Sequence, residues 1–336
     1  MSASGPPPVW FERPVLADFA DTVAAACAIL GPGTDDDPYA GIATAVAAIA
    51  GPAPYDAAVM DRAPDLRVIA RTGIGYDGVD VAVATRRGIA VCNTPDGPTI
   101  STAEHAVALM LAVAKNVKTS ESALRRGMTR DYYGRHEAIE LEGKRLGLVG
   151  FGRIARHVAR IAGGIGMRIE FFDPYIASDA VPDGIRRASS LETMLGEADV
   201  VSVHVPLTDA SRGLFGATQF AAMKDGAVFI NTARGGLVDH DALLHALEAG
   251  RLFGAGLDVT SPEPLPVGHP LLVRDDVVVT PHVASATADG KARMFRVAFR
   301  QAIDVIEGRR PEYLVNPEVW AGLAQTARAA NAGVGT

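Results

Sequence analysis

The chain has 336 residues, of which 48% are hydrophobic and 21% are charged, so it is long enough to bury the cores of two domains. Its formal net charge of −7 argues against a nucleic-acid-binding surface. Cys27 and Cys92 lie in unrelated apolar contexts, which predicts neither a disulfide framework nor a zinc site. The histidines show no H-E-x-x-H spacing either, so we expect no metal. We also expect no membrane contact and a cytoplasmic location, because no apolar run could span a bilayer and no cleavable signal is recognisable.

The first part of the chain alternates short apolar runs with helix-like runs, which is typical of stacked βα units. Residues 5–8 are predicted to be a disordered lead-in. A long amphipathic helix is then predicted from Ser101 to about Arg126, followed by an arginine-bearing loop that ends at Gly143. The predicted strands before that helix are residues 14–17, 28–30, 45–50, 67–71 and 89–92, and the predicted helices are residues 55–63 and 79–87.

A cleaner doubly wound pattern begins at Lys144. Ser189 and Glu192 have the spacing of a capping box at a helix start, and a last long helix is predicted over residues 286–307. The predicted strands are residues 145–150, 167–173, 199–205, 227–231, 253–258 and 277–280, with a helix over residues 241–249. The simplest organisation is two βα domains, the second inserted into the first, with the two long helices as the crossings.

The most informative segment joins a strand, a glycine turn and a helix. Gly150 allows the tight turn, Gly152 lets the backbone approach a pyrophosphate, and Ala155 takes the third position of the motif. Asp173 ends the next strand, where its carboxylate can accept hydrogen bonds from the ribose hydroxyls. Glycines alone would fit an ordinary turn equally well. In this context they predict a dinucleotide site, and the absence of arginine in Pro174-Tyr-Ile176 favours NAD over NADP.

Three side chains follow predicted strand ends, where open α/β sheets bind ligands. Arg234 can grip a carboxylate through two parallel hydrogen bonds, although an isolated arginine is more often a surface or ion-pair residue. Glu263 lies between two prolines that stiffen its backbone; otherwise it would be a solvated loop acid. His282 follows a β-rich run, and a carboxylate beside it would favour the protonated imidazolium that a proton donor requires.

These motifs together resemble the NAD-dependent D-isomer-specific 2-hydroxyacid dehydrogenases, which include phosphoglycerate dehydrogenase, glyoxylate/hydroxypyruvate reductases, D-lactate dehydrogenases and phosphonate dehydrogenase. The resemblance covers about residues 14–316. It is carried by Arg71-Thr-Gly-Ile-Gly-Tyr-Asp-Gly-Val-Asp80, the Gly150 fingerprint with Asp173, Asn231-Thr-Ala-Arg234-Gly, Leu257-Asp-Val-x-x-x-Glu263-Pro and Thr280-Pro-His282.

The resemblance implies a fold, a cofactor and residue roles. The fold is α/β with two Rossmann-like domains: a flavodoxin-like substrate domain (residues 1–101 and 286–336) and an inserted doubly wound NAD-binding domain (residues 102–285). Arg234 would bind the substrate carboxylate, Glu263 would orient and charge the histidine, and His282 would exchange the proton. The amides of Gly73, Ile74 and Gly75 would complete the carboxylate cradle, unless that run is only a glycine turn. The implied NAD contacts are Gly150, Gly152, Arg153, Ile154, Asp173, Val205, Pro206, Thr232, Ala233 and Asp258, the last on the nicotinamide side.

The expected reaction is reversible hydride transfer between NADH and a small 2-oxo acid, in a homodimer. Departures from the family pattern bear on the substrate: the uncharged loop Gly51-Pro-Ala-Pro54 and the chain length argue against 3-phosphoglycerate. A phosphate could still meet arginines of the loop, namely Arg125, Arg126, Arg130 and Arg135, which are otherwise a solvated basic loop. Activity as a phosphonate dehydrogenase remains an alternative, because that enzyme keeps the Arg–Glu–His set. Formate dehydrogenases share the fold but pair the histidine with glutamine, whereas this chain has Glu263. A non-enzymatic alternative is an NAD-responsive transcriptional corepressor.

Overall fold

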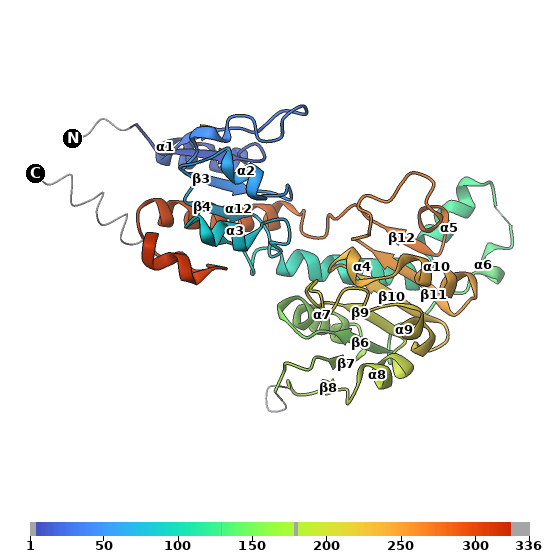
Figure 1. Cartoon of the computed structure of the whole chain (residues 1–336). Coiled ribbons are helices and arrows are strands. Elements are labelled where there is room, and N and C mark those ends of the chain that lie inside the picture. The colour runs from blue at the N-terminus through green and yellow to red at the C-terminus, as the bar shows by residue number, and fades with distance from the viewer. Residues whose placement is uncertain (1–4, 129, 178–180, 324–336) are drawn as a thin grey trace, which may run out of the picture. The chain divides into compact units, whose positions relative to one another are not determined.

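The computed structural model describes residues 5–128, 130–177 and 181–323. The chain divides into two compact units, which we call unit 1 (Met1–Pro98 with Thr287–Thr336) and unit 2 (Thr99–Ala286). The sequence prediction placed the changes of domain at residues 102 and 285. Figure 1 shows the elements of both units along the chain.

Unit 1 is built on a five-stranded parallel sheet with the order β2-β1-β3-β4-β5, which is the flavodoxin-like order. Helix α12 packs against β3, β4 and β5 of this sheet. The strands are β1 (Pro8–Phe11), β2 (Ala28–Leu30), β3 (Ala47–Ala50), β4 (Val68–Arg71) and β5 (Ala90–Cys92). The helices are α1 (Ala20–Ala26), α2 (Ala57–Asp61), α3 (Val81–Arg86) and α12 (Ala288–Ile306), with 3-10 turns at Ala17–Phe19, Ile42–Thr44 and Pro317–Val319.

Unit 2 is built on a seven-stranded parallel sheet with the order β12-β11-β10-β9-β6-β7-β8. The strand order reverses between β9 and β6, the point at which doubly wound sheets bind ligands. The strands are β6 (Arg145–Val149), β7 (Arg168–Phe172), β8 (Arg186–Arg187), β9 (Val200–Val203), β10 (Ala227–Asn231), β11 (Leu252–Leu257) and β12 (Val277–Val279). The helices are α4 (Thr99–Ala114), α5 (Val117–Arg125), α6 (Tyr132–Arg135), α7 (Arg153–Gly164), α8 (Leu191–Glu197), α9 (Ala217–Ala222), α10 (His240–Glu248) and α11 (Pro270–Val273), with a 3-10 turn at Gly235–Leu237.

Both sheets bury both faces, which explains why their strands read as continuous apolar runs. Successive residues of a strand point to opposite sides, so Val9 and Phe11 join one cluster of unit 1 while Trp10 joins the other. In unit 2, Val201 and Val200 enter separate clusters in the same way. The predicted fold class, α/β with two Rossmann-like sheets, is confirmed.

The structure corrects several predicted elements. No strand forms at residues 14–17; the first strand is β1, which begins at a proline whose carbonyl still accepts a hydrogen bond from Val46 N. The helix predicted over residues 101–126 is two helices, because Asn116 adopts a left-handed conformation with φ 51°. Helix α8 is capped by Ser190, not by Ser189, and the two-residue edge strand β8 was not predicted.

Within the described residues, no helix is long and apolar enough to cross a membrane. The same part of the chain contains no group of three or more histidine, cysteine or acidic side chains able to hold a metal ion. Cys27 and Cys92 are both buried and unbridged. Burial raises the pKa of the Cys27 thiol to about 11 and that of Cys92 to about 12, so both side chains are neutral at ordinary pH.

Candidate functional site

The turn between β6 and α7 has the geometry that a pyrophosphate site requires. Gly150 has φ +86°, and a side chain there would lie 2.8 Å from the His204 carbonyl oxygen and 2.8 Å from Val205 Cγ1. Gly152 caps α7, and a Cβ at that position would meet no atom within 4 Å. Protein atoms therefore pack tightly against Gly150, whereas the space beside Gly152 is open.

The open side of this turn presents backbone donors at the positive end of a twelve-residue helix. Among the described residues, the N–H groups of Gly152 and Ile154 have no hydrogen-bond partner, and Arg153 begins the helix. The carboxylate of Asp173 lies at the end of β7, where its two oxygens accept hydrogen bonds from Phe151 N and Tyr175 N, both at 2.9 Å. These bonds fix the orientation of the predicted ribose acceptor.

The neighbouring strand ends supply the other predicted cofactor contacts. Val205 and Pro206 follow β9, and Val205 packs behind the Gly150 turn. The hydroxyl of Thr232 after β10 is buried and has no hydrogen-bond partner in the part of the chain that the structure describes. A buried polar atom without a partner is costly, so this hydroxyl is available to a ligand group, and its predicted contact with NAD stays a prediction. The open glycine turn, the backbone donors and the Thr232 hydroxyl fit a dinucleotide.

Burial also acts on His204, which follows β9 and lies behind the glycine turn. Desolvation lowers the pKa of this histidine to about 4, and its Nε2 lies 2.9 Å from Ser202 Oγ. His204 is consequently neutral at physiological pH.

Arg234 lies on a turn that is fixed by two hydrogen bonds of the Asn231 side chain. Asn231 Oδ1 accepts from Ala233 N, and its Nδ2 donates to the Arg234 carbonyl, both at 2.9 Å. The next residue, Gly235, packs so closely that a Cβ would lie 1.9 Å from the Thr260 carbonyl oxygen. Only glycine fits there, and the turn of Arg234 is thereby placed directly against the loop that carries Glu263.

His282 and Glu263 are paired. Nδ1 of His282 lies 2.6 Å from Glu263 Oε1, and the other carboxylate oxygen accepts from Thr260 N at 3.3 Å. A carboxylate only accepts, so Nδ1 carries hydrogen and Nε2 is left to exchange a proton. Nε2 has no hydrogen-bond partner within the described residues, and the His282 side chain is 46% exposed. The structure thus brings together two of the three predicted catalytic side chains.

Asp258 is buried beneath the same loop, with no exposed side-chain surface. Its oxygens accept hydrogen bonds from Thr280 Oγ1 at 2.6 Å, Val283 N at 2.9 Å and Ala284 N at 2.8 Å. The Asp258 carbonyl also accepts from His282 N at 2.7 Å. The carboxylate therefore holds the segment that carries His282; its predicted contact with the nicotinamide side stays a prediction.

In unit 1, residues 73–75 form a turn after β4 whose carbonyl groups are all occupied. Gly73 O accepts from Thr94 N, Ile74 O from Asn93 Nδ2 and Gly75 O from Arg71 Nε. The three N–H groups of Gly73, Ile74 and Gly75 have no partner among the residues described. Such a set of successive unpaired backbone donors suits an anion.

The sequence reasoning missed Glu12, which follows β1. Its carboxylate accepts from Gly51 N at 2.6 Å and Ala53 N at 3.0 Å, so it fixes the uncharged loop after β3. Burial, and next the charge of Glu12, raise the pKa of Tyr55 above its usual value. The misplaced first strand hid this residue, because a strand at residues 14–17 leaves Glu12 away from the carboxyl ends of the strands.

The arginines of the loop have local partners where the structure describes them. Arg125 pairs with Glu121, and Arg126 pairs with Asp275 at 2.6 Å. Arg130 is exposed, and the side chain of Arg135 lies outside the described residues. These pairs support the reading of a solvated basic loop for Arg125 and Arg126.

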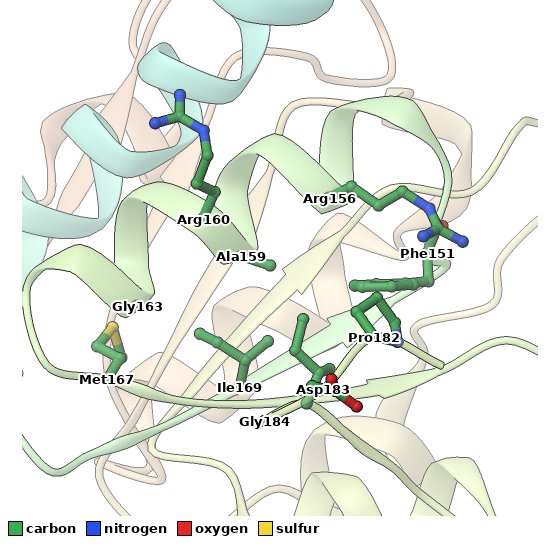
Figure 2. A pocket seen from close by; sticks show the side chains of 11 residues that line it. Phe151, Arg156, Ala159, Arg160, Gly163, Met167, Ile169, Pro182, Asp183 and Gly184 are labelled. Atoms are coloured by element: carbon green, nitrogen blue, oxygen red, sulfur yellow. The ribbon is translucent and has the colours of Figure 1, made fainter. Parts of the chain in front are cut away.

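A further pocket of about 420 Å³ lies between α7 and β7, and Phe151 of the glycine turn is one of its lining residues. Figure 2 shows Ala159 and Gly163 of α7 on one side, Ile169 below and Pro182 to Gly184 opposite. The guanidinium of Arg156 is already engaged, because it lies 4.7 Å from the centre of the Phe151 ring and its Nε donates to the Phe151 carbonyl. We assign no ligand to this pocket.

Comparison with known proteins identifies the family. The profile of the D-isomer specific 2-hydroxyacid dehydrogenase, NAD binding domain, matches residues 107–284. A glyoxylate reductase from Korarchaeum cryptofilum is 41% identical over 268 residues, which is 79% of this chain and 81% of that protein. A D-3-phosphoglycerate dehydrogenase from Archaeoglobus fulgidus is 38% identical over 263 residues, 78% of this chain but 49% of that protein, so the chain spans about half the length of this relative.

The solved structure of the TT0316 protein from Thermus thermophilus has a TM-score of 0.85 to this chain at 40% identity, covering 92% of this chain and 99% of that one. Since the family profile takes in the cofactor turn and the strands of unit 2, and relatives extend the similarity over more than three quarters of the sequence, the chain belongs to the D-isomer specific 2-hydroxyacid dehydrogenase family of NAD-dependent oxidoreductases.

Proposed function

We propose that this protein transfers hydride reversibly between NADH and a small 2-oxo acid, forming a D-2-hydroxy acid. The observation that carries the proposal is the 2.6 Å pair of His282 Nδ1 and Glu263 Oε1, which leaves Nε2 open for proton exchange. This pair lies in the same unit as the glycine turn that suits the dinucleotide.

Each side chain has a separate task in the proposed reaction. Bound NADH supplies the hydride that reaches the carbonyl carbon. Arg234 binds the substrate carboxylate through its forked guanidinium and fixes the carbonyl in one orientation. In reduction, His282 releases its Nε2 proton to the carbonyl oxygen as the alcohol forms, and the imidazole becomes neutral. Glu263 accepts the Nδ1–H throughout, which stabilises the imidazolium before transfer. Oxidation reverses these steps.

The loop after β3 favours a substrate with an uncharged side chain. Gly51 to Pro54 carry no charge, and the Glu12 carboxylate is bonded to the amides of Gly51 and Ala53. A phosphate or second carboxylate brought to this loop would meet the negative charge of Glu12. Gly73, Ile74 and Gly75 remain predicted substrate ligands, supported by their unpaired amides in the described structure.

The test is a screen of NADH oxidation with glyoxylate, hydroxypyruvate, pyruvate, 2-oxoglutarate and bulkier 2-oxo acids. Phosphite and 3-phosphoglycerate are assayed in the oxidative direction. Turnover of uncharged 2-oxo acids supports the proposal, preference for 3-phosphoglycerate or phosphite would redirect it to those dehydrogenases, and no turnover on any compound would favour the corepressor alternative.

Two variants then test the assigned roles with the preferred substrate. His282→Gln should lower kcat about 10²–10⁴-fold and leave NADH affinity nearly unchanged, because only proton transfer is lost. Arg234→Ala should raise KM and lower kcat together, since the carboxylate is no longer held. Near-normal kinetics in either variant would refute the corresponding role. A homodimer and a cytoplasmic location remain part of the proposal, and light scattering of the purified protein tests the first.

A further inference from the structure

The structure holds a histidine behind the proposed active site that the reaction does not itself require. His105 lies on α4, and its side chain is 23% exposed. Its Nε2 lies 2.9 Å from Thr280 Oγ1 and 3.5 Å from Asp258 Oδ1. Thr280 and Asp258 are the residues at which the segment carrying His282 is tied to the sheet of unit 2.

The donors and acceptors in the hydrogen-bond chain His105–Thr280–Asp258 can be assigned from their chemistry. The Asp258 oxygens act as acceptors for two backbone N–H groups and for Thr280, so the hydroxyl hydrogen of Thr280 points at Asp258 Oδ1. The Thr280 oxygen can then only accept from His105. His105 must therefore carry hydrogen on Nε2, and the bonds run from His105 through Thr280 to Asp258.

The segment that these bonds hold has a conformation that needs support. His282 has φ 53°, in the left-handed region that residues other than glycine rarely adopt. Such a conformation is strained and persists only where surrounding contacts enforce it. The contacts here are the bonds from His282 N to the Asp258 carbonyl and from Val283 N and Ala284 N to the Asp258 carboxylate.

We propose that His105 is a positioning residue for the proton donor. Its Nε2–H orients Thr280 and Asp258, and these residues hold the backbone of His282 so that Nδ1 meets Glu263 and Nε2 faces outward. His105 touches neither reacting atom in this arrangement. The inference rests on the proposed function, because His282 is the proton donor only there.

The test compares three variants of His105 and its partner in the full-length protein. His105→Leu removes the donor and should lower kcat about 10–100-fold with KM for NADH within about twofold, because a shift of His282 by about 1 Å is enough for such a loss. His105→Gln can place an amide N–H where Nε2 lies and should recover most of kcat. Thr280→Val breaks the same chain at its centre and should reproduce the loss. His245→Leu, at an exposed histidine of α10, is the matched control and should leave kcat unchanged.

A double-mutant cycle separates positioning from general destabilisation. His105→Leu combined with Thr280→Val should lose little more than either change alone, because both break one chain. Urea unfolding establishes that each variant is folded under assay conditions. Wild-type kcat in His105→Leu, failure of the glutamine to recover activity, or fully additive losses would each overturn the inference. If instead His282→Gln is as active as the wild type, the proposed function itself fails.

Discussion

Gly235 offers the sharpest test of how the site is assembled. A Cβ at this position would lie 1.9 Å from the Thr260 carbonyl oxygen and 2.1 Å from its carbon, whereas ordinary contact begins at 3.4 Å. The obstacle is the backbone of Thr260, so no side-chain rotation relieves the clash. In Gly235→Ala, the turn of Arg234 and the loop of Glu263 must separate by about 1.5 Å or strain their hydrogen bonds.

The expected cost has two parts. Overpacking of this kind destabilises the fold by about 1–3 kcal/mol. Displacing Arg234 and Glu263 by more than 1 Å should lower kcat/KM about 10²-fold, because near-attack geometry is lost. The neighbouring Gly236→Ala is the matched control, since the nearest atoms to its Cβ would be side-chain atoms: the two terminal methyl groups of Leu207, at 3.1 and 3.3 Å, and Arg212 Nη1, at 3.5 Å. Both side chains can rotate away.

The assays are steady-state kinetics with the preferred 2-oxo acid and urea unfolding of both variants. The expected result is a large loss of kcat/KM and of stability in Gly235→Ala and small changes in Gly236→Ala. If the two variants were indistinguishable in both measurements, the close approach of Gly235 to Thr260 would not hold the site together.

Two further predictions concern the cofactor side of unit 2. Asp173→Ser should weaken NADH binding about tenfold or more and narrow the preference over NADPH, because a hydrogen bond to a charged group contributes about 1.5–3 kcal/mol and a 2′-phosphate is no longer repelled; an unchanged ratio of the two KM values would contradict this role. Since burial lowers the pKa of His204 to about 4, below its ordinary value of 6.5, the unfolded chain binds a proton that the folded protein does not. Stability should be full above pH 6.5 and fall by about 3 kcal/mol as the pH drops from 6.5 toward 4. Urea unfolding should show a smaller fall in His204→Gln, and equal falls would refute the assignment.

Much of the fold could be predicted because both sheets are buried on both faces. Apolar runs such as residues 227–231 are strands in the structure with the bounds that the sequence indicated. The failures arise where local signals compete. Prolines concealed β1, whose first residue needs no N–H because its carbonyl makes the bond to Val46. Asn116 breaks a continuous amphipathic pattern by adopting a left-handed conformation, which periodicity does not reveal.

The sequence alone predicts the cofactor turn and proposes Arg234, Glu263 and His282 as catalytic residues, because each lies in a short motif whose chemistry is local. The residues that hold these side chains in place could not be predicted in this way. Glu12 reaches Gly51 across 39 residues, and His105 reaches Thr280 across 175. Such partners are brought together only when parallel strands align their carboxyl ends, or when a helix packs beside them. The tertiary structure therefore decided which residues hold the site in place, including the glycine at 235 that lets the Arg234 turn lie against the loop of Glu263.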